Sequence, residues 1–357
     1  MRKLRSILVT GGAGFIGTNF IRYLLETVGY DGRIVNLDAL TYAGNAENLA
    51  DLENGPASAH YTLVRGDICD RPLVERVFRD HGIDTVVHFA AESHVDRSIL
   101  GPEAFVRTNV MGTYTLLDVA RQTWKDAEGM LFHHVSTDEV YGSLGPQGAF
   151  VETTPYDPRS PYSASKAASD HLARAYHHTY GLPLTVSNCS NNYGPYQFPE
   201  KLIPLMILNM QEGKSLPVYG DGRNVRDWLY VGDHVAAIWT ILRKAEAGRS
   251  YNVGGDSQWE NIRLLEELID IVARRTGKSA QAIRATITHV RDRPGHDRRY
   301  AIDCSALKRD LGWTQTVPLD EGLQKTVAWY LDNEAWVARV RTGEHARWIE
   351  RNYGART

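Results

Sequence analysis

Residues 7–17 read Ile7-Leu8-Val9-Thr10-Gly11-Gly12-Ala13-Gly14-Phe15-Ile16-Gly17, and this stretch decides the fold class. The apolar run at its start predicts a buried strand, and a helical pattern follows the glycines. The glycines match two related spacings, G-x-G-x-x-G from Gly12 and G-x-x-G-x-x-G from Gly11. Glycines between a strand and a helix let the backbone turn tightly and approach a pyrophosphate, which rests on the helix N-terminus. The stretch therefore predicts a dinucleotide site near the start of the chain.

A second strand is expected over residues 33–37, and it ends at Asp38. A carboxylate at this position accepts hydrogen bonds from both ribose hydroxyls of an adenosine and repels a 2′-phosphate, which favours NAD over NADP. The alternative is that Asp38 only caps the end of the strand. A third strand, over residues 63–68, carries Asp67, which is placed to bond the adenine amine.

Strands alternate with helices up to about residue 190, which predicts an α/β fold with a Rossmann-type, doubly wound parallel sheet. A fourth strand, over residues 85–91, ends in small residues that let the chain pass close under a cofactor. Ser93 follows it in a loop, and Thr108 lies in the next helix. His88, His133 and His134 lie in apolar strands without the spacing of metal ligands, so we interpret them as structural and expect no metal site.

The composition argues against several classes of protein. A formal net charge of −3 is unlike a nucleic-acid binder, which carries a basic excess or stripe. Cys69, Cys189 and Cys304 stand far apart, which argues against a disulfide framework or a zinc site and favours a reducing cytoplasm. No apolar run reaches the length of a transmembrane helix, so we expect no membrane partner.

Two adjacent acids, Asp138 and Glu139, follow Thr137 at the end of an apolar run over residues 131–135. In an open parallel sheet, the end of such a strand borders the ligand crevice. Adjacent carboxylates there are costly unless they are used or paired, because each resists ionising beside the other. The plain alternative is a solvated acidic turn.

Tyr162 and Lys166 are four residues apart in a helix that we expect to begin at Pro161. At this spacing the two side chains lie on one face of the helix. A cation near a phenol favours phenolate, so we expect the tyrosine pKa to be lowered toward neutrality. Tyr162 would then be a general base for a sugar hydroxyl while NAD takes the hydride. The alternative is a pair on an ordinary helix surface.

With these residues in place, the chain resembles the extended short-chain dehydrogenase/reductase superfamily and, more narrowly, the dTDP-glucose 4,6-dehydratases. The resemblance runs from Thr10-Gly11-Gly12 to Asp292-Arg293-Pro294-Gly295-His296-Asp297. Thr137-Asp138-Glu139 is its most specific part, since related epimerases lack the acidic pair and related decarboxylases keep only the second acid. The resemblance implies a homodimer, formed through helices near residues 109–120 and 162–180.

The resemblance also implies a reaction, a lyase converting dTDP-glucose to its 4-keto-6-deoxy product. Tyr162 takes the O4 proton as C4 is oxidised, and Thr137 holds O4. The ketone acidifies the C5 hydrogen, which Glu139 removes while protonated Asp138 donates to the departing C6 hydroxyl. Adjacent carboxylates in a dry crevice tend to titrate apart, which suits these opposite protonation states. Which carboxylate is the acid follows from the resemblance alone.

The second half contains a loop over residues 188–196, which we expect to lead into a smaller mixed α/β domain. The predicted NAD-binding domain covers residues 1–190 and about 223–256, and the nucleotide-sugar domain covers about 191–222 and 257–357. Residues 225–230 are expected to form a strand that returns to the first domain. Arg226 and Arg293 are expected to clamp the diphosphate, because a guanidinium matches phosphate in bidentate geometry.

The resemblance extends the two sets of binding residues. Those expected to bind NAD are Gly11, Gly14, Phe15, Ile16, Gly17, Asp38, Ala39, Leu40, Thr41, Asp67, Ile68, Phe89, Ala90, Ala91, Ser93, Thr108, Tyr162, Lys166 and Asn192. Those expected to bind the nucleotide-sugar are Ser93, Thr137, Asn191, Glu200, Lys201, Leu202, Pro217, Tyr219, Arg226, Asn261, Arg293 and His296.

Three alternatives stay open from the sequence. UDP-glucose is a rival substrate, since one methyl group changes a pocket only slightly. A nucleotide-sugar 4-epimerase would need Tyr162, Lys166 and NAD but not the acidic pair. A catalytically dead regulator that senses NAD is the rival from another class.

Overall fold

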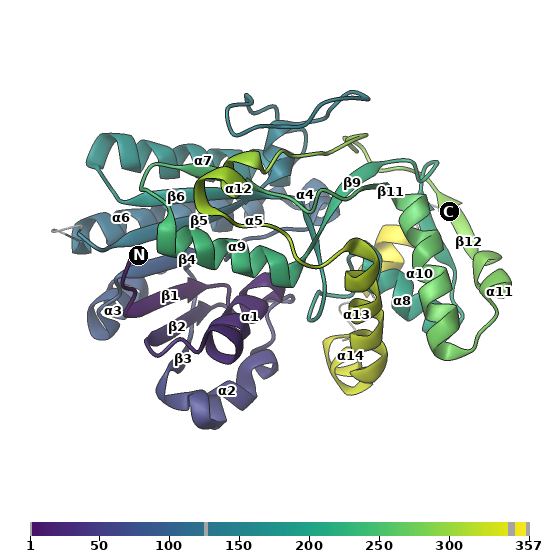
Figure 1. Cartoon of the computed structure of the whole chain (residues 1–357), viewed down its shortest axis with the longest axis horizontal. Coiled ribbons are helices and arrows are strands. Elements are labelled where there is room, and N and C mark those ends of the chain that lie inside the picture. The colour runs from purple at the N-terminus through teal and green to yellow at the C-terminus, as the bar shows by residue number, and fades with distance from the viewer. Residues whose placement is uncertain (1, 125–127, 342–346, 355–357) are drawn as a thin grey trace.

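A computed structural model describes residues 2–124, 128–341 and 347–354, and a seven-stranded parallel sheet forms its centre (Figure 1). This confirms the predicted doubly wound α/β fold. The strands, in spatial order, are β10 (Ser250–Val253), β6 (Leu184–Cys189), β5 (Leu131–Thr137), β4 (Thr85–His88), β1 (Ser6–Thr10), β2 (Arg33–Asp38) and β3 (Tyr61–Arg65).

Helices cover both faces of this sheet, which explains why its strands are apolar on both sides. Successive residues of β1 point to opposite faces, so Ile7 and Val9 join one hydrophobic cluster and Leu8 joins another. The first face is covered by α1 (Phe15–Arg22), which continues into η1 (Tyr23–Val28), and by α9 (Val231–Lys244). The second face is covered by α3 (Arg71–His81), α6 (Thr113–Thr123) and α7 (Pro161–Tyr180).

Short helices fill the connections between these elements. They are η2 (Ala46–Leu49), α2 (Ala50–Asn54), η3 (Pro56–Ala59), α4 (Val95–Leu100), α5 (Pro102–Phe105), η4 (Val106–Gly112) and η5 (Asp138–Tyr141).

The helix predicted from Pro161 is present, and its first turn is well defined. The Ser160 hydroxyl accepts from the Ser163 amide at 3.1 Å, and the Ser163 hydroxyl accepts from the Ser160 amide at 3.0 Å. This reciprocal capping box, with proline at the first helical position, satisfies amide groups that a helix start leaves free. It fixes Tyr162 in the first turn of α7.

A second group of elements follows β6 and has its own hydrophobic cluster. Its strands are β7 (Asn191–Tyr193), β9 (Val225–Tyr230) and β11 (Gln258–Glu260), in the order β11-β9-β7, and the pair β8 (Leu216–Tyr219) and β12 (Ile287–Val290). Its helices include α8 (Leu202–Glu212), α10 (Asn261–Thr276), α11 (Ala280–Arg284), α13 (Leu319–Asp332) and α14 (Glu334–Val340), and η6 (Glu350–Gly354) lies near the end of the chain.

One segment differs from its expected pairing. The strand predicted over residues 225–230 exists as β9, but it pairs with β7 and β11, and the return to the large sheet is made by α9 and β10. Helix α12 (Ser305–Leu311) packs with α9 and β10. The predicted domain boundaries stay a prediction, and their ranges include residues 342–346 and 355–357, which lie outside the described part of the chain.

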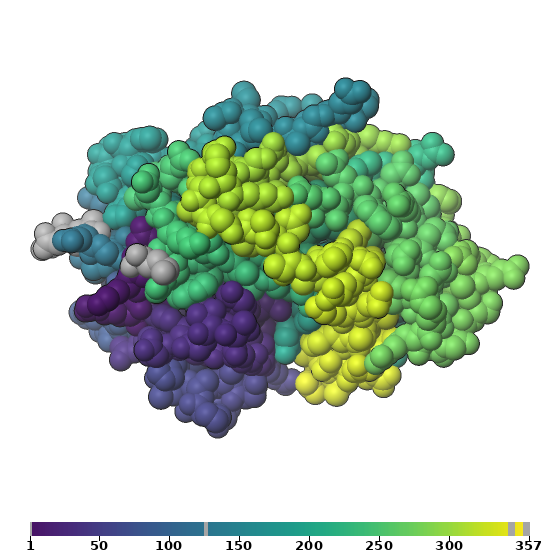
Figure 2. Space-filling view, in the orientation of Figure 1, coloured from purple at the N-terminus to yellow at the C-terminus, as the bar shows by residue number. Residues whose placement is uncertain are grey.

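The C-terminal helices also touch the N-terminal part of the chain. The Trp336 indole in α14 donates to the Asn48 side chain at 2.7 Å, and Asn48 in turn donates to the Ala13 carbonyl. Figure 2 shows the yellow C-terminal helices lying beside the purple N-terminal residues. The glycine-rich loop is therefore braced from the far end of the sequence.

We predict that Gly17→Ala destabilises the fold by about 1–3 kcal/mol, the usual cost of overpacking. A Cβ at Gly17 would lie 2.3 Å from the Gly11 carbonyl oxygen and 2.6 Å from the Gly12 Cα. Urea denaturation measures the loss. Helix propensity alone would make the alanine variant more stable by about 1 kcal/mol. A loss of stability would therefore show that the close packing outweighs helix propensity at this position.

Gly145→Ala is the matched control, because a Cβ there meets open space. Equal stability of the two variants would contradict the close packing of the glycine-rich turn.

Candidate active site

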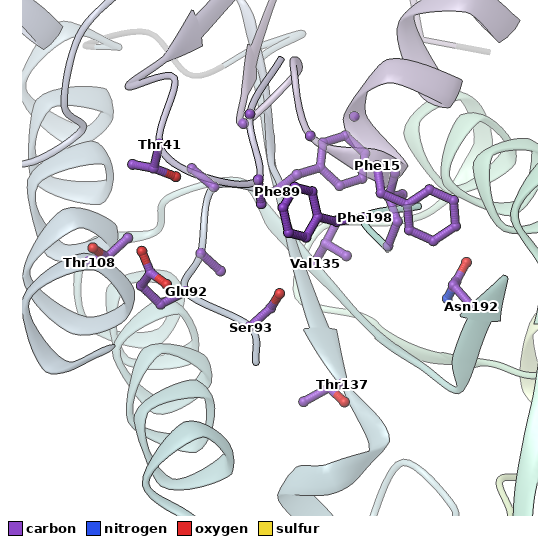
Figure 3. A pocket seen from close by; sticks show the side chains of 18 of the residues that line it. Phe15, Thr41, Phe89, Glu92, Ser93, Thr108, Val135, Thr137, Asn192 and Phe198 are labelled. Carbon is purple, nitrogen blue, oxygen red and sulfur yellow. The ribbon is translucent and has the colours of Figure 1, made fainter. Parts of the chain in front are cut away.

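A cavity lies at the carboxyl ends of β1, β4 and β5, where the chain connections leave the sheet in opposite directions. In open α/β sheets this switch point is the ordinary place for a ligand. Its walls come from the glycine-rich turn, from the ends of β2, β4 and β5, from α7 and from residues 189–201. Figure 3 shows Thr41, Thr108, Glu92 and Ser93 on one side of this cavity and Phe15, Phe198 and Asn192 on the other.

The glycine-rich turn has the shape that a pyrophosphate needs. Gly11 has a φ of +71°, and a Cβ there would lie 2.7 Å from the Ala90 backbone, so only glycine permits this approach of β1 to β4. Asp38 is buried, and its two oxygens accept from the amides of Ala13 at 2.9 Å and Leu40 at 2.8 Å. Glycine backbone, an open helix N-terminus and this carboxylate fit a dinucleotide with a free ribose diol.

The predicted NAD-binding residues come together in this cavity, with one exception. All of them line it except Leu40, whose amide instead holds the Asp38 carboxylate. Leu40 thus touches the site only through Asp38.

The acidic pair lies where β5 turns into η5. The Thr137 hydroxyl accepts from the Glu139 amide at 3.3 Å, which makes the chain turn between the two acids and brings both to the cavity. Asp138 is 1% exposed, and its Oδ2 atom has no hydrogen-bond partner among the described residues. A solvated acidic turn is therefore excluded.

The two acids experience different electrostatic environments. Burial raises the pKa of Asp138 well above its usual value, and the charges of Glu139 and Asp227 raise it further. Burial also raises the pKa of Glu139, but Arg293, Arg226 and Lys201 oppose that rise. The pKa of Asp138 is therefore raised more than that of Glu139, so the two adjacent acids titrate apart.

Tyr162 and Lys166 line the same cavity and are 8% and 4% exposed. The expected lowering of the Tyr162 pKa is wrong for the protein alone. Burial and the charge of Glu139 raise this pKa, and a hydrogen bond with the Thr137 hydroxyl only partly opposes them. The Lys166 amino group donates to the Val135 carbonyl at 2.8 Å, and burial lowers its own pKa.

The predicted substrate residues fall into two groups. Ser93, Thr137, Asn191, Glu200 and Lys201 line the cavity described above. The others lie outside its lining, and they are Leu202, Pro217, Tyr219, Arg226, Asn261, Arg293 and His296.

Arg226 and Arg293 in the second group still act on the acidic pair through their charge. The Arg226 guanidinium donates to the Val225 and Asp297 carbonyls and lies 4.3 Å from the centre of the Tyr300 ring. Two of its five N–H groups thus donate to backbone oxygens, and the others remain for a ligand. Arg293 lies 3.7 Å from the Asp96 carboxylate.

Several residues of the site escaped the sequence analysis. Tyr42, Glu92, Cys189 and Gln197 line the cavity. Tyr42 directly follows the predicted Ala39–Thr41 segment, so extending that loop by one residue would have found it.

No pattern in the sequence around Arg97 indicates that this residue lies at the site. Its guanidinium lies between the rings of Tyr42, at 3.8 Å, and Trp348, at 4.3 Å, and pairs with Glu200 at 2.9 Å. These partners are far apart in sequence, so only the folded chain brings them together.

Residues 2–124, 128–341 and 347–354 contain no group of three or more His, Cys, Asp or Glu side chains able to hold a metal ion. Over the same ranges, no helix has the length and apolarity needed to cross a membrane.

Comparison with known proteins agrees with the geometry. The family model described as GDP-mannose 4,6 dehydratase matches residues 8–326. A dTDP-glucose 4,6-dehydratase of Xanthomonas campestris pv. campestris (strain B100) is 55% identical over 344 residues, covering 95% of this chain and 96% of the relative. The dTDP-glucose 4,6-dehydratase 1 of Escherichia coli (strain K12) is 51% identical over 364 residues, covering 98% and 99%.

Solved structures agree as well. DesIV, a dTDP-glucose 4,6-dehydratase from Streptomyces venezuelae with NAD and a second ligand bound, has a TM-score of 0.84 and 47% identity, covering 93% of this chain and 98% of that one. A Thermus thermophilus UDP-glucose 4-epimerase in complex with NAD has a TM-score of 0.80 and 30% identity, covering 92% and 99%. This chain therefore belongs to the NAD-dependent nucleotide-sugar epimerase/dehydratase family and, within it, to the dTDP-glucose 4,6-dehydratases.

Proposed function

We propose that this enzyme converts dTDP-glucose to dTDP-4-keto-6-deoxyglucose by oxidation at C4, loss of water across C5 and C6, and reduction at C6. The observation that carries the proposal is the acidic pair, in which the buried Asp138, whose pKa is raised well above its usual value, adjoins Glu139 in the cavity that Tyr162 also lines. NAD, when bound against the glycine-rich turn and Asp38, supplies a cationic ring that accepts a hydride from C4 and gives it back to C6.

Tyr162 handles the O4 proton. Its side chain and that of Thr137 line the same cavity, so both hydroxyls are placed to hold one sugar oxygen. Lys166, one helical turn further along α7, keeps positive charge near the phenol. Because the protein raises the Tyr162 pKa, the phenol becomes a base only with this cation and a bound cofactor.

Glu139 and Asp138 carry the elimination. Oxidation at C4 acidifies the C5 hydrogen, and Glu139, whose ionised form is favoured by three neighbouring cations, removes it. Asp138 has a proton to give to the C6 hydroxyl, so the leaving group departs as water. When C6 is reduced, Glu139 returns its proton to C5.

The binding roles follow the predicted sets. We assign the NAD-binding role to the residues predicted for it that line the cavity, and the hexose contacts to Ser93, Thr137, Asn191, Glu200 and Lys201. We assign the contacts with the diphosphate and the base to the predicted substrate residues outside the cavity lining, which are Leu202, Pro217, Tyr219, Arg226, Asn261, Arg293 and His296. We assign thymidine rather than uridine as the base of the substrate. The support is that two relatives, 55% and 51% identical to this chain, are named as dTDP-glucose 4,6-dehydratases.

A nucleotide-sugar 4-epimerase is the rival function, since such an enzyme shares the fold at 30% identity. It would have no use for a buried acid that keeps its proton beside a second carboxylate. A dead NAD-sensing regulator is equally disfavoured, because Tyr162 and Lys166 both reach the cavity.

We also propose a homodimer in the cytoplasm. Val106 and Met111 on η4, Tyr114 on α6 and Tyr180 at the end of α7 are exposed by 38–55%. These helices pack against one another and place the apolar groups on neighbouring surfaces, which is typical of an interface. Three unpaired cysteines support the reducing compartment.

The central test is Glu139→Gln. We expect dehydration of dTDP-glucose, followed by the alkaline ketosugar chromophore, to fall by about 10²–10⁴-fold, because the C5 base is lost. The first oxidation should persist, so NADH absorbance should still appear in a single turnover. Glu92→Gln, which changes another carboxylate of the same cavity, should lose less than tenfold.

Two results of that test would contradict the proposal. An enzyme that keeps its turnover after Glu139→Gln is an epimerase rather than a dehydratase. Wild-type enzyme that turns over UDP-glucose and dTDP-glucose equally well lacks the thymidine preference.

Asp138→Asn should stabilise the protein increasingly as the pH rises. The folded-state pKa of Asp138 is raised, so the wild type carries no penalty below the unfolded pKa of about 4 and a growing penalty above it. Asparagine mimics the protonated acid, so above pH 5 the gain in unfolding free energy should rise by about 1.4 kcal/mol per pH unit until the pH reaches the folded-state pKa of Asp138.

Urea titrations at several pH values measure this gain, with Asp80→Asn on the exposed side of α3 as the control. A gain that is equal at pH 5 and pH 8 would show that Asp138 is already ionised in the folded protein.

Met111→Glu with Tyr114→Glu should split the dimer. Burying two carboxylates in an apolar interface is strongly unfavourable, so the sedimenting species should fall from twice the chain mass to 40.0 kDa. Val151→Glu, at an exposed valine outside these helices, should leave the mass unchanged. A wild type that sediments at 40.0 kDa would remove the dimer.

A further inference from the structure

We propose that Asp170 is a positioning residue of the active site, which acts as the buried counter-ion that keeps Lys166 charged beside Tyr162. The inference deepens the proposed function, on which it rests. Asp170 lies one helical turn beyond Lys166 in α7, as Lys166 lies one turn beyond Tyr162.

The register of α7 sets the three side chains in a row. Tyr162, Lys166 and Asp170 follow one another at intervals of four residues, so they lie on one face of the helix. Their exposures fall along the row, from 8% through 4% to 0%. Asp170 is thus the deepest group of the row and has no access to water.

The Asp170 carboxylate is held by four donors. His134 Nε2 lies 3.0 Å from Oδ1, while the Ser136 hydroxyl, the Tyr156 hydroxyl and the Asn188 amide donate to Oδ2 at 2.8, 2.9 and 3.3 Å. Carboxylates that accept several hydrogen bonds stay ionised even when buried. Burial opposes ionisation here, but the hydrogen bond from His134 and the charge of Lys166 outweigh it and lower the Asp170 pKa.

Lys166 needs such a charge nearby. Its amino group makes a hydrogen bond to the Val135 carbonyl, and it forms no ion pair within 4.0 Å in the part of the chain that the structure describes. Burial lowers its pKa, and the charge of Asp170 is the strongest influence in the opposite direction. Without that charge, a buried ammonium group would release its proton more easily.

The other groups around this pair do not supply the same charge. His134 from β5 and His88 from β4 face Lys166, and burial lowers the pKa of both, so they stay neutral. Cys189 from β6 has a pKa raised by burial to about 12 and stays a thiol. Arg174, further along α7, is a cation that donates to Tyr156. Among the described groups that influence the Lys166 pKa, Asp170 is therefore the one that carries a negative charge.

A charged Lys166 matters for the chemistry of Tyr162. Burial and the charge of Glu139 both favour the neutral phenol. A cation on the same face of α7, one turn from Tyr162, favours the phenolate instead, and Lys166 is placed to supply it. A neutral lysine would leave the phenol protonated and the O4 proton without an acceptor. Asp170 would influence the reaction in this way without touching the substrate.

Asp170→Asn tests the role. We expect the alkaline limb of the kcat–pH profile for dTDP-glucose to move to lower pH by about one unit or more, because one nearby charge shifts a pKa by about 1–3 units. Tyr156→Phe is the matched control, since it removes a hydrogen bond from the same carboxylate but no charge, and its limb should stay in place. In the Lys166→Arg background the Asp170→Asn shift should vanish, because arginine keeps its proton.

A direct titration gives a readout besides turnover. In protein labelled with ¹³Cε-lysine, the Lys166 resonance, assigned with Lys166→Met, should show an ammonium group at pH 7 in the wild type and titrate at lower pH in Asp170→Asn. A wild-type Lys166 that is neutral at pH 7 overturns the proposal, even where the Asp170→Asn variant does not fold. An unchanged Lys166 titration in the folded variant overturns it too.

The two proposals fail in different ways. Absence of ketosugar from wild-type enzyme would remove the proposed function and leave the Lys166 titration to judge Asp170. Normal ketosugar formation with an unmoved alkaline limb in Asp170→Asn would remove the counter-ion role alone.

Discussion

The cost of placing charge out of water governs this active site. Asp138, Tyr162, Lys166 and Asp170 are all at most 8% exposed, and burial is the largest influence on the pKa of each. Burial pushes acids toward their protonated forms and lysine toward its neutral form. Every group that must be charged therefore needs a specific neighbour, and the fold supplies those neighbours one by one.

The sheet and one helix provide most of them. Because β5 and β6 are parallel neighbours, Ser136 lies beside Asn188 in register, and both side chains reach Asp170. Strand β5 ends at Thr137, and the acidic pair follows directly in η5. Helix α7 packs against this end of the strand and carries Tyr162 in its first turn. These elements thus hold Thr137, the acidic pair, Tyr162, Lys166 and Asp170.

Local patterns predicted a large part of this arrangement. Strand, glycine turn and helix follow directly from residues 7–28, and the phase of Tyr162 and Lys166 follows from the helix that Pro161 begins. The position of Arg97 between Tyr42 and Trp348 could not be predicted, because it joins three distant segments. The Tyr162 pKa was mispredicted for a related reason, since helix spacing shows neither the depth of burial nor the nearby charge of Glu139.

The electrostatic difference within the acidic pair is likewise a tertiary property, and β9 contributes to it. Arg226 and Asp227 are consecutive in this strand, so they point to opposite sides. Burial raises the pKa of both acids, and the charge of Arg226 opposes that rise in each of them. Asp227, held by the Gly255 and Ser257 amides, adds to the rise of the Asp138 pKa. Since β9 pairs with β7 and β11 in a separate sheet, the docking of that sheet brings these charges to the acidic pair. The ionisation of the two acids at the end of β5 therefore depends in part on a strand that comes after β6 in the sequence.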